Sequence, residues 1–89
     1  MAVFKARKIK RELLRKLQAE EESGKHHIYR VSDDDGTFLG ETYISRGEAE
    51  IGDPLLGQMA RELNISLALW RDIIRCPKGR SEYIIEARQ

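Results

Sequence analysis

Cysteine and histidine are scarce in this chain of 89 residues, which contains one cysteine and two histidines. The lone Cys76 cannot form an internal disulfide framework. One cysteine and two histidines are also too few for the four ligands of a closed structural zinc site. No phosphate-loop, dinucleotide-binding or nucleophile-elbow motif is present. We therefore expect no metal and no cofactor, and we do not expect a large-scaffold enzyme.

Long apolar runs are absent as well. No stretch approaches the about 20 apolar residues of a membrane-spanning helix, and no apolar signal-peptide core follows the basic N-terminus. The sequence therefore predicts no membrane partner and a cytoplasmic location. Hydrophobic residues still make up 40% of the chain, which is too large a share for a disordered protein. The length fits a single domain over residues 1–89.

The charge is nearly balanced overall but unevenly placed, with a formal net charge of only +1. A basic N-terminal cluster is offset locally only by Glu12. Its members are Lys5, Arg7, Lys8, Lys10, Arg11, Arg15 and Lys16. Such a cluster is either a solvated helix face or a surface that contacts phosphates or a partner. The nucleic-acid-binding candidates in it are Arg7, Lys8, Lys10, Arg11 and Arg15.

The first segment, residues 1–24, is predicted to form a basic helix from about Phe4 to Ser23. Ile9, Leu13 and Leu17 recur every four residues and so share one helical face. The order of charges is unusual for a helix, because the cations lie in its first half and three glutamates, at 20–22, lie at its C-terminal end. Both placements oppose the helix macrodipole. Helix stability therefore did not select this order.

The second segment, residues 25–51, is predicted to form a β-hairpin with strands at 26–31 and 37–45 and a turn at 32–36. Closing the turn between residues 32 and 37 places Val31 opposite Phe38 and His27 opposite Thr42. Alternation along a strand puts His26 and His27 on opposite faces, but the sequence leaves open which one is exposed. Residues 48–51 are a candidate third strand. The three aspartates at 33–35 lack the alternate ligand spacing of a calcium loop and fit turn chemistry.

The third segment, residues 52–89, is predicted to be helical. Asp53 and Pro54 are typical of a helix start, and the apolar series that follows has helical spacing up to Leu63. A second helix is predicted at 67–75, and residues 81–87 favour a helix over an edge strand. Residues 59–75 also resemble a helix-turn-helix. However, the apolar start of the second helix favours core packing over the reading of base edges.

The residues best suited to chemistry lie at the start of the first hairpin strand. A histidine titrates near neutral pH and can move a proton, and a neighbouring cation can hold a phosphate. RNA cleavage needs both groups, and Lys25, His26, His27 and Arg30 supply them within six residues. The alternative is that both histidines are ordinary strand residues.

A helix followed by a strand hairpin that begins Gly24-Lys25-His26-His27-Ile28-Tyr29-Arg30, and then a helical half, resembles the HicA family of toxin–antitoxin mRNA interferases. The resemblance runs from about Ile9 to Ser66. It implies a double-stranded-RNA-binding-like fold with helices on one face of a small antiparallel sheet, and it makes His26 the matching catalytic candidate. Lys25 departs from the usual Ser or Thr, and residues 67–89 extend past the usual end.

Together these observations predict an α+β fold: an N-terminal helix, a small antiparallel sheet of two to three strands and C-terminal helices packed on one face. The leading functional hypothesis is a metal-independent endoribonuclease in which His26, or else His27, is the acid–base group. RNA is the expected partner, with an antitoxin protein or a second copy as further partners. The alternatives are a non-enzymatic nucleic-acid-binding regulator and a protein-interaction domain. The predicted core comprises Ile9, Leu13, Leu17, Val31, Phe38, Ile44, Leu56, Met59, Leu63, Trp70, Ile73 and Ile74.

Overall fold

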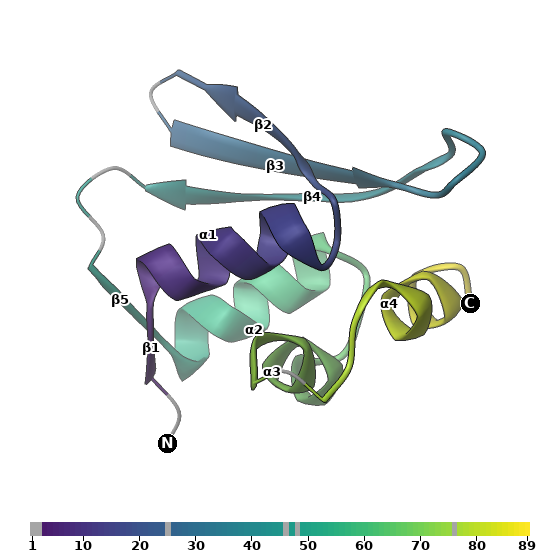
Figure 1. Ribbon diagram of the computed structural model, residues 1–89. Helices are drawn as coiled ribbons and strands as arrows, with labels where there is room; N and C mark the ends of the chain where they lie inside the picture. The colour runs from purple at the N-terminus through teal and green to yellow at the C-terminus, as the bar shows by residue number, and fades with distance from the viewer. Residues whose placement is uncertain (1–2, 25, 46, 48, 76) are drawn as a thin grey trace.

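A computed structural model describes residues 3–24, 26–45, 47, 49–75 and 77–89 (Figure 1). The fold is α+β, as predicted. In chain order the elements are β1 (Val3–Lys5), α1 (Ala6–Arg15), β2 (Glu20–Ser23), β3 (His26–Ser32), β4 (Phe38–Ser45), β5 (Glu50–Gly52), α2 (Asp53–Glu62), α3 (Leu67–Arg75) and α4 (Arg80–Ala87). None of the described helices has the length and apolar character needed to cross a membrane.

The N-terminal helix is shorter than predicted. Helix α1 ends at Arg15, and Gln18 takes a left-handed backbone conformation with φ 53°, so the chain leaves the helix axis there. The glutamates that would have opposed a helix dipole lie in β2, which pairs with β3. The prediction of a helix up to Ser23 is therefore wrong. Leu17 is nevertheless fully buried, because the loop after α1 carries it into the core.

The three-stranded antiparallel sheet has the order β2-β3-β4. In it Val31 pairs with Gly40 and His27 with Ile44, two residues away from the predicted register. The difference in register arises at the end of the hairpin, where the strand pairing is irregular at Val31/Ser32. The loop beyond this point is closed by a hydrogen bond from the Asp33 N–H to the Thr37 carbonyl. Because side chains alternate with a period of two, a shift of two leaves the residues beyond the irregularity, from Val31 back to His26, on their predicted faces.

A second, two-stranded sheet joins β1 to β5, with Val3 opposite Gly52. The candidate third strand at 48–51 overlaps β5 at Glu50 and Ile51, while residue 48 lies outside the described residues. Strand β5 pairs with the N-terminal strand and not with the hairpin. No sequence pattern indicates β1, because three residues are too few to show a period. The third strand of the larger sheet is β2.

Helices α1 and α2 lie on the same side of the three-stranded sheet, and α3 lies beyond them (Figure 1). Helix α2 packs against both β4 and α3. The approach to β4 is close: a Cβ built on Gly40 would lie 2.8 Å from the Leu63 Cα. Glycine at position 40 therefore lets the end of α2 contact the strand backbone.

The core contains every predicted residue except Phe38, which is 59% exposed. The irregularity beside Ser32 interrupts the alternation of β4, so Leu39 turns inward in place of Phe38. In α3 Leu69 and Trp70 lie inside the core, as expected for packing rather than base reading, while Leu67 is half-buried and Ala68 is exposed.

The C-terminal helix α4 confirms the predicted helix at 81–87. Its side chains form hydrogen bonds with three distant parts of the chain. The Tyr83 hydroxyl donates to the Leu63 carbonyl at 3.0 Å. The Arg80 guanidinium donates to the carbonyls of Leu17 and Ser32, each at 2.7 Å. These bonds connect α4 to the loop after α1 and to the end of β3. We call this set of contacts the Arg80 clasp.

Candidate functional site

The two histidines have opposite surroundings, as strand alternation predicts. His26 is exposed on the sheet face away from the helices, with its ring 5.2 Å from that of Tyr43. His27 lies on the face toward α1, and its side chain is 23% exposed. We call these the outer face and the inner face of the sheet. Only His27 faces the basic helix.

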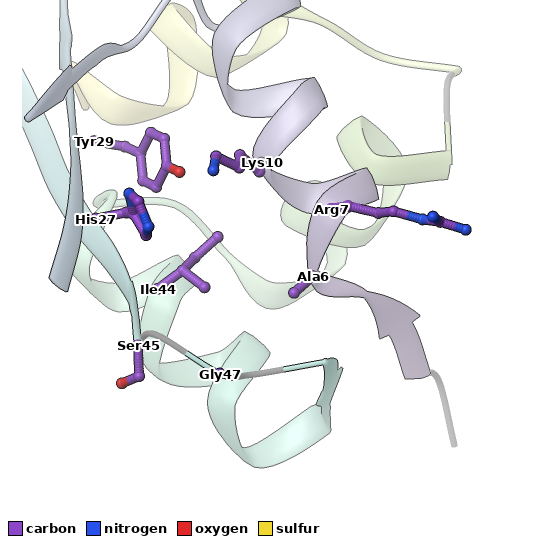
Figure 2. A pocket seen from close by; sticks show the side chains of 8 residues that line it. All are labelled: Ala6, Arg7, Lys10, His27, Tyr29, Ile44, Ser45 and Gly47. Carbon is purple, nitrogen blue, oxygen red and sulfur yellow. The ribbon is translucent and has the colours of Figure 1, made fainter. Parts of the chain in front are cut away.

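A cavity of about 300 Å³ lies between α1 and the inner face (Figure 2). Figure 2 shows the His27 ring, the Tyr29 hydroxyl and the Lys10 side chain directed into one space. The Arg7 guanidinium points away from His27, on the other side of the helix. The lining residues are Ala6, Arg7, Lys10, His27, Tyr29, Ile44, Ser45 and Gly47. A cavity of this size has room for a phosphate and a sugar but not for a large cofactor.

One carboxylate, that of Glu21 in β2, contacts three groups at the cavity. The Tyr29 hydroxyl donates to Glu21 Oε2 at 3.0 Å. The same oxygen lies 3.1 Å from His27 Nδ1 and 3.6 Å from Lys10 Nζ. His27 Nδ1 is buried and lies out of line for a hydrogen bond, so its contact with Glu21 is electrostatic. We call Lys10, Glu21, His27 and Tyr29 the inner cluster.

Tyr29 anchors the inner cluster. Burial, together with the hydrogen bond to Glu21 and the charge of that carboxylate, raises the pKa of Tyr29 well above its usual value of 10.0. The phenol therefore stays protonated at neutral pH and remains a donor. Because the register places Glu21 directly opposite Tyr29, the strand pairing itself fixes the position of the carboxylate.

The predicted nucleic-acid-binding residues of α1 divide into two groups. Lys8 and Lys10 have internal partners, since Lys8 Nζ lies 3.6 Å from Glu12 and Lys10 Nζ contacts Glu21. Arg7, Arg11 and Arg15 are exposed and form no ion pair with any described residue. Only the arginines are therefore available to an outside anion without breaking an internal contact.

The remaining two candidates do not join the cavity. Arg30 lies on the outer face, where its Nε donates to Glu41 at 2.6 Å and its Nη1 to Glu22 at 3.1 Å. These bonds raise the pKa of Arg30 and, mainly through the hydrogen bond, lower the pKa of Glu22. Lys25 lies outside the described residues. The structure thus brings His27 and Lys10 together and separates them from His26 and Arg30.

Sequence reasoning missed Glu21 as a site residue. A signal for Glu21 was present, because a run of glutamates at the predicted end of a helix opposes the macrodipole. That conflict indicates that the helix ends earlier and that the glutamates belong to another element. Tyr29 was placed correctly on the His27 face, but its partner cannot be identified without β2.

The aspartates of the β3–β4 turn serve the fold. Asp35 Oδ1 accepts a bond from the Thr37 N–H at 3.0 Å, which lowers the pKa of Asp35. Asp34 pairs with Arg80 at 3.0 Å, and Asp33 pairs with Arg88. Among the described residues, no group of three or more His, Cys, Asp or Glu side chains is arranged to hold a metal ion.

Comparison with known proteins finds no matching family model, no matching curated protein and no matching solved structure. The resemblance to the HicA family therefore stays a prediction.

Proposed function

We propose that the chain binds RNA and cleaves it without a metal ion, with His27 as the acid–base group. The observation that carries this proposal is the position of His27. It is the histidine that lines a cavity, with a carboxylate 3.1 Å from Nδ1 and the Lys10 ammonium on the same carboxylate. A partly buried imidazole beside a carboxylate is a common arrangement for proton transfer.

The proposed reaction uses the ribose 2′-hydroxyl as the nucleophile. His27 Nε2 takes the 2′-proton while the 2′-oxygen attacks the adjacent phosphorus. The bond from phosphorus to the 5′-oxygen breaks, and the leaving oxygen takes a proton from water. The products are a 2′,3′-cyclic phosphate and a 5′-hydroxyl end. Glu21 stabilises the imidazolium, and Lys10 stabilises charge on the phosphoryl oxygens.

His26 is the weaker candidate, although the family resemblance selects it. It lies on the outer face beside Tyr43, with the acidic side chains of Glu22 and Glu41 on the same face. Among the described residues, the cation paired there is Arg30, which is held by both of those carboxylates. In this part of the chain the carboxylates of the outer face leave no free cation beside His26, whereas a phosphate approaching His27 meets α1.

The first prediction separates the two histidines by RNA cleavage on a gel with EDTA present. We expect His27→Ala to lower the cleavage rate at least about 100-fold, the usual size of a lost acid–base group. His26→Ala is the matched control and should cleave within about twofold of wild type, because His26 faces away from the cavity. Both variants should keep the wild-type circular dichroism spectrum.

Two outcomes would overturn the proposal. Full activity in folded His27→Ala would exclude His27 as the acid–base group. Cleavage of a substrate that carries a 2′-deoxyribose at the cut would exclude the proposed nucleophile. Glu21→Gln adds a finer test, because loss of the carboxylate charge should lower the rate by less than loss of the imidazole.

A second candidate function is RNA binding without cleavage. It is favoured by one observation: the exposed arginines of α1 form no ion pair within the described part of the chain, whether or not His27 is active. This function predicts salt-dependent RNA binding by a folded chain that leaves RNA intact in the same gel assay. The protein would then be a regulator and not an enzyme.

A further inference from the structure

The cations near the N-terminus separate by residue type. Each lysine in this region has an internal partner: Lys5 with Glu50 at 3.5 Å, Lys8 with Glu12, Lys10 with Glu21, and Lys16 with the Ile73 carbonyl at 2.6 Å. The arginines of α1 have no partner among the described residues. Arginine binds phosphate through two parallel bonds, whereas lysine acts as a point charge. The arginines, which lack a partner among the described residues, are therefore better suited to bind phosphate than the paired lysines.

The free arginines are evenly spaced. Arg7, Arg11 and Arg15 follow one another at four-residue intervals, so consecutive ones lie about 6 Å apart along the helix axis and on one side of it. Ile9 and Leu13 are buried on the opposite side. Arg7 is also a lining residue of the cavity that contains His27. The row of arginines thus begins beside the cavity, with the Arg7 guanidinium directed away from His27 across the helix, and runs toward the C-terminal end of α1.

We propose that Arg7, Arg11 and Arg15 form a track that binds successive phosphates of one RNA strand leaving the cavity. The substrate is then an RNA that continues for at least about three nucleotides on one side of the cut, one for each arginine. This inference rests on the proposed function and deepens it by naming the substrate.

The features of this face favour a nucleic acid over an acidic protein. A polymer with one negative charge per repeat matches a row of evenly spaced cations. A protein interface needs an apolar or aromatic centre, and the large apolar side chain exposed on α1 is Leu14 alone among the described residues, at 37%. An RNA strand needs no such centre.

The second prediction concerns the salt dependence of RNA binding, measured by fluorescence anisotropy on wild-type protein with 2′-O-methyl RNA, which cannot be cleaved through the 2′-hydroxyl. We expect Arg11→Gln/Arg15→Gln to lower the slope of log affinity against log salt by about 1.4, since each single-strand phosphate contributes about 0.7. The matched control, Lys5→Gln/Lys78→Gln, removes the same charge from exposed, partnered lysines. It should change the slope by less than about 0.5.

Two results would overturn the track. An equal slope change in both double variants would mean that diffuse charge, and not the row of arginines, binds RNA. Equal competition by polyglutamate at matched charge would mean that the surface binds acidic protein. We expect instead that polyglutamate competes far less well than unlabelled RNA.

Substrate length separates this inference from the proposed function. In wild type, cleavage efficiency should rise as the RNA is extended on one side and level off after about three nucleotides. Arg11→Gln/Arg15→Gln should flatten that dependence. If Arg11→Gln/Arg15→Gln lowers the salt slope but the wild type cleaves no RNA, the arginine track is supported and the endoribonuclease proposal is wrong. Cleavage with no dependence on length, and unchanged slopes, would overturn the track alone.

Discussion

The inner and outer faces of the three-stranded sheet carry similar residue types in different environments. On the inner face Tyr29 and Thr42 are buried, and each hydroxyl donates to a glutamate of another element, Glu21 or Glu62. On the outer face Arg30 and Tyr43 are accessible, and Arg30 bonds only to neighbouring strands. Two inner-face contacts therefore join the sheet to the helices, namely that of Thr42 with Glu62 of α2 and that of Glu21 with Lys10 of α1. The outer contacts of Arg30 stay within the sheet.

This difference explains why two adjacent histidines are not equivalent. Composition and local sequence treat His26 and His27 alike. Burial, a carboxylate at hydrogen-bond distance and a basic helix distinguish them, and all three come from pairing and packing between distant segments. The comparison predicts that substitutions on the inner face disturb both stability and the cavity, while those on the outer face disturb neither.

The largest expected effect on stability is that of Gly40→Ala on the inner face. The added methyl group would lie 2.8 Å from the Leu63 Cα, and backbone cannot move aside as a flexible side chain can. We expect the free energy of unfolding in urea to fall by about 2–3 kcal/mol. Gly24→Ala is the control, because its methyl group meets no atom within 4 Å. Equal loss in the two variants would contradict the close packing of α2 on β4.

An intermediate effect is expected from Tyr29→Phe, compared with Tyr43→Phe on the outer face. Loss of the hydroxyl leaves Glu21 without its donor and should lower the free energy of unfolding by about 1 kcal/mol, whereas Tyr43→Phe should change it little. Because the folded-state pKa of Tyr29 is raised above 10.0, its stabilisation is complete below pH 10 and is lost as the pH rises above that value. Urea unfolding from pH 8 to 11 should therefore show a shallower alkaline decline in Tyr29→Phe. If the free energy of unfolding declines as steeply in Tyr29→Phe as in wild type, Tyr29 is not the cause of the alkaline decline.

The smallest effect is expected from Arg30→Gln. Its ion pairs with Glu22 and Glu41 are solvent-exposed, and water and salt weaken such pairs. The midpoint of urea unfolding should match that of wild type within the precision of the measurement, at low and at high salt. Because Arg30 lowers the pKa of Glu22, any stability from the pair exists above pH 4.5 and is lost below it. A large loss at neutral pH would make the outer face as structurally important as the inner one.

Much of the fold follows from local sequence pattern. The helices at 53–62, 67–75 and 80–87 follow from apolar spacing and end signals, and the hairpin follows from β-branched runs flanking an Asp-Gly turn. The stripe of Ile9, Leu13 and Leu17 was correctly predicted as core, although the helix stops at Arg15. Pairing with β3 overrides the helix propensity of the glutamates at 20–22.

The candidate site was less predictable for the same reason. Local sequence placed His27 and Tyr29 on one face, but neither Glu21 nor the packing of α1 on that face follows from the hairpin alone. The division of the α1 cations into paired lysines and free arginines likewise depends on glutamates in other strands. The sequence therefore shows which cations α1 contains, but it does not show which of them lack a partner among the described residues.

The Arg80 clasp shows that a small protein can connect distant parts of its chain with little additional loss of entropy. Its guanidinium reaches carbonyls that lie 63 and 48 residues earlier. The entropy lost on closing a loop grows only with the logarithm of its length, so these loops cost about 1.2 kcal/mol more than loops a quarter as long. Two charge-assisted hydrogen bonds offset that difference. A single late arginine can therefore hold a loop and a strand end that were made much earlier in the sequence.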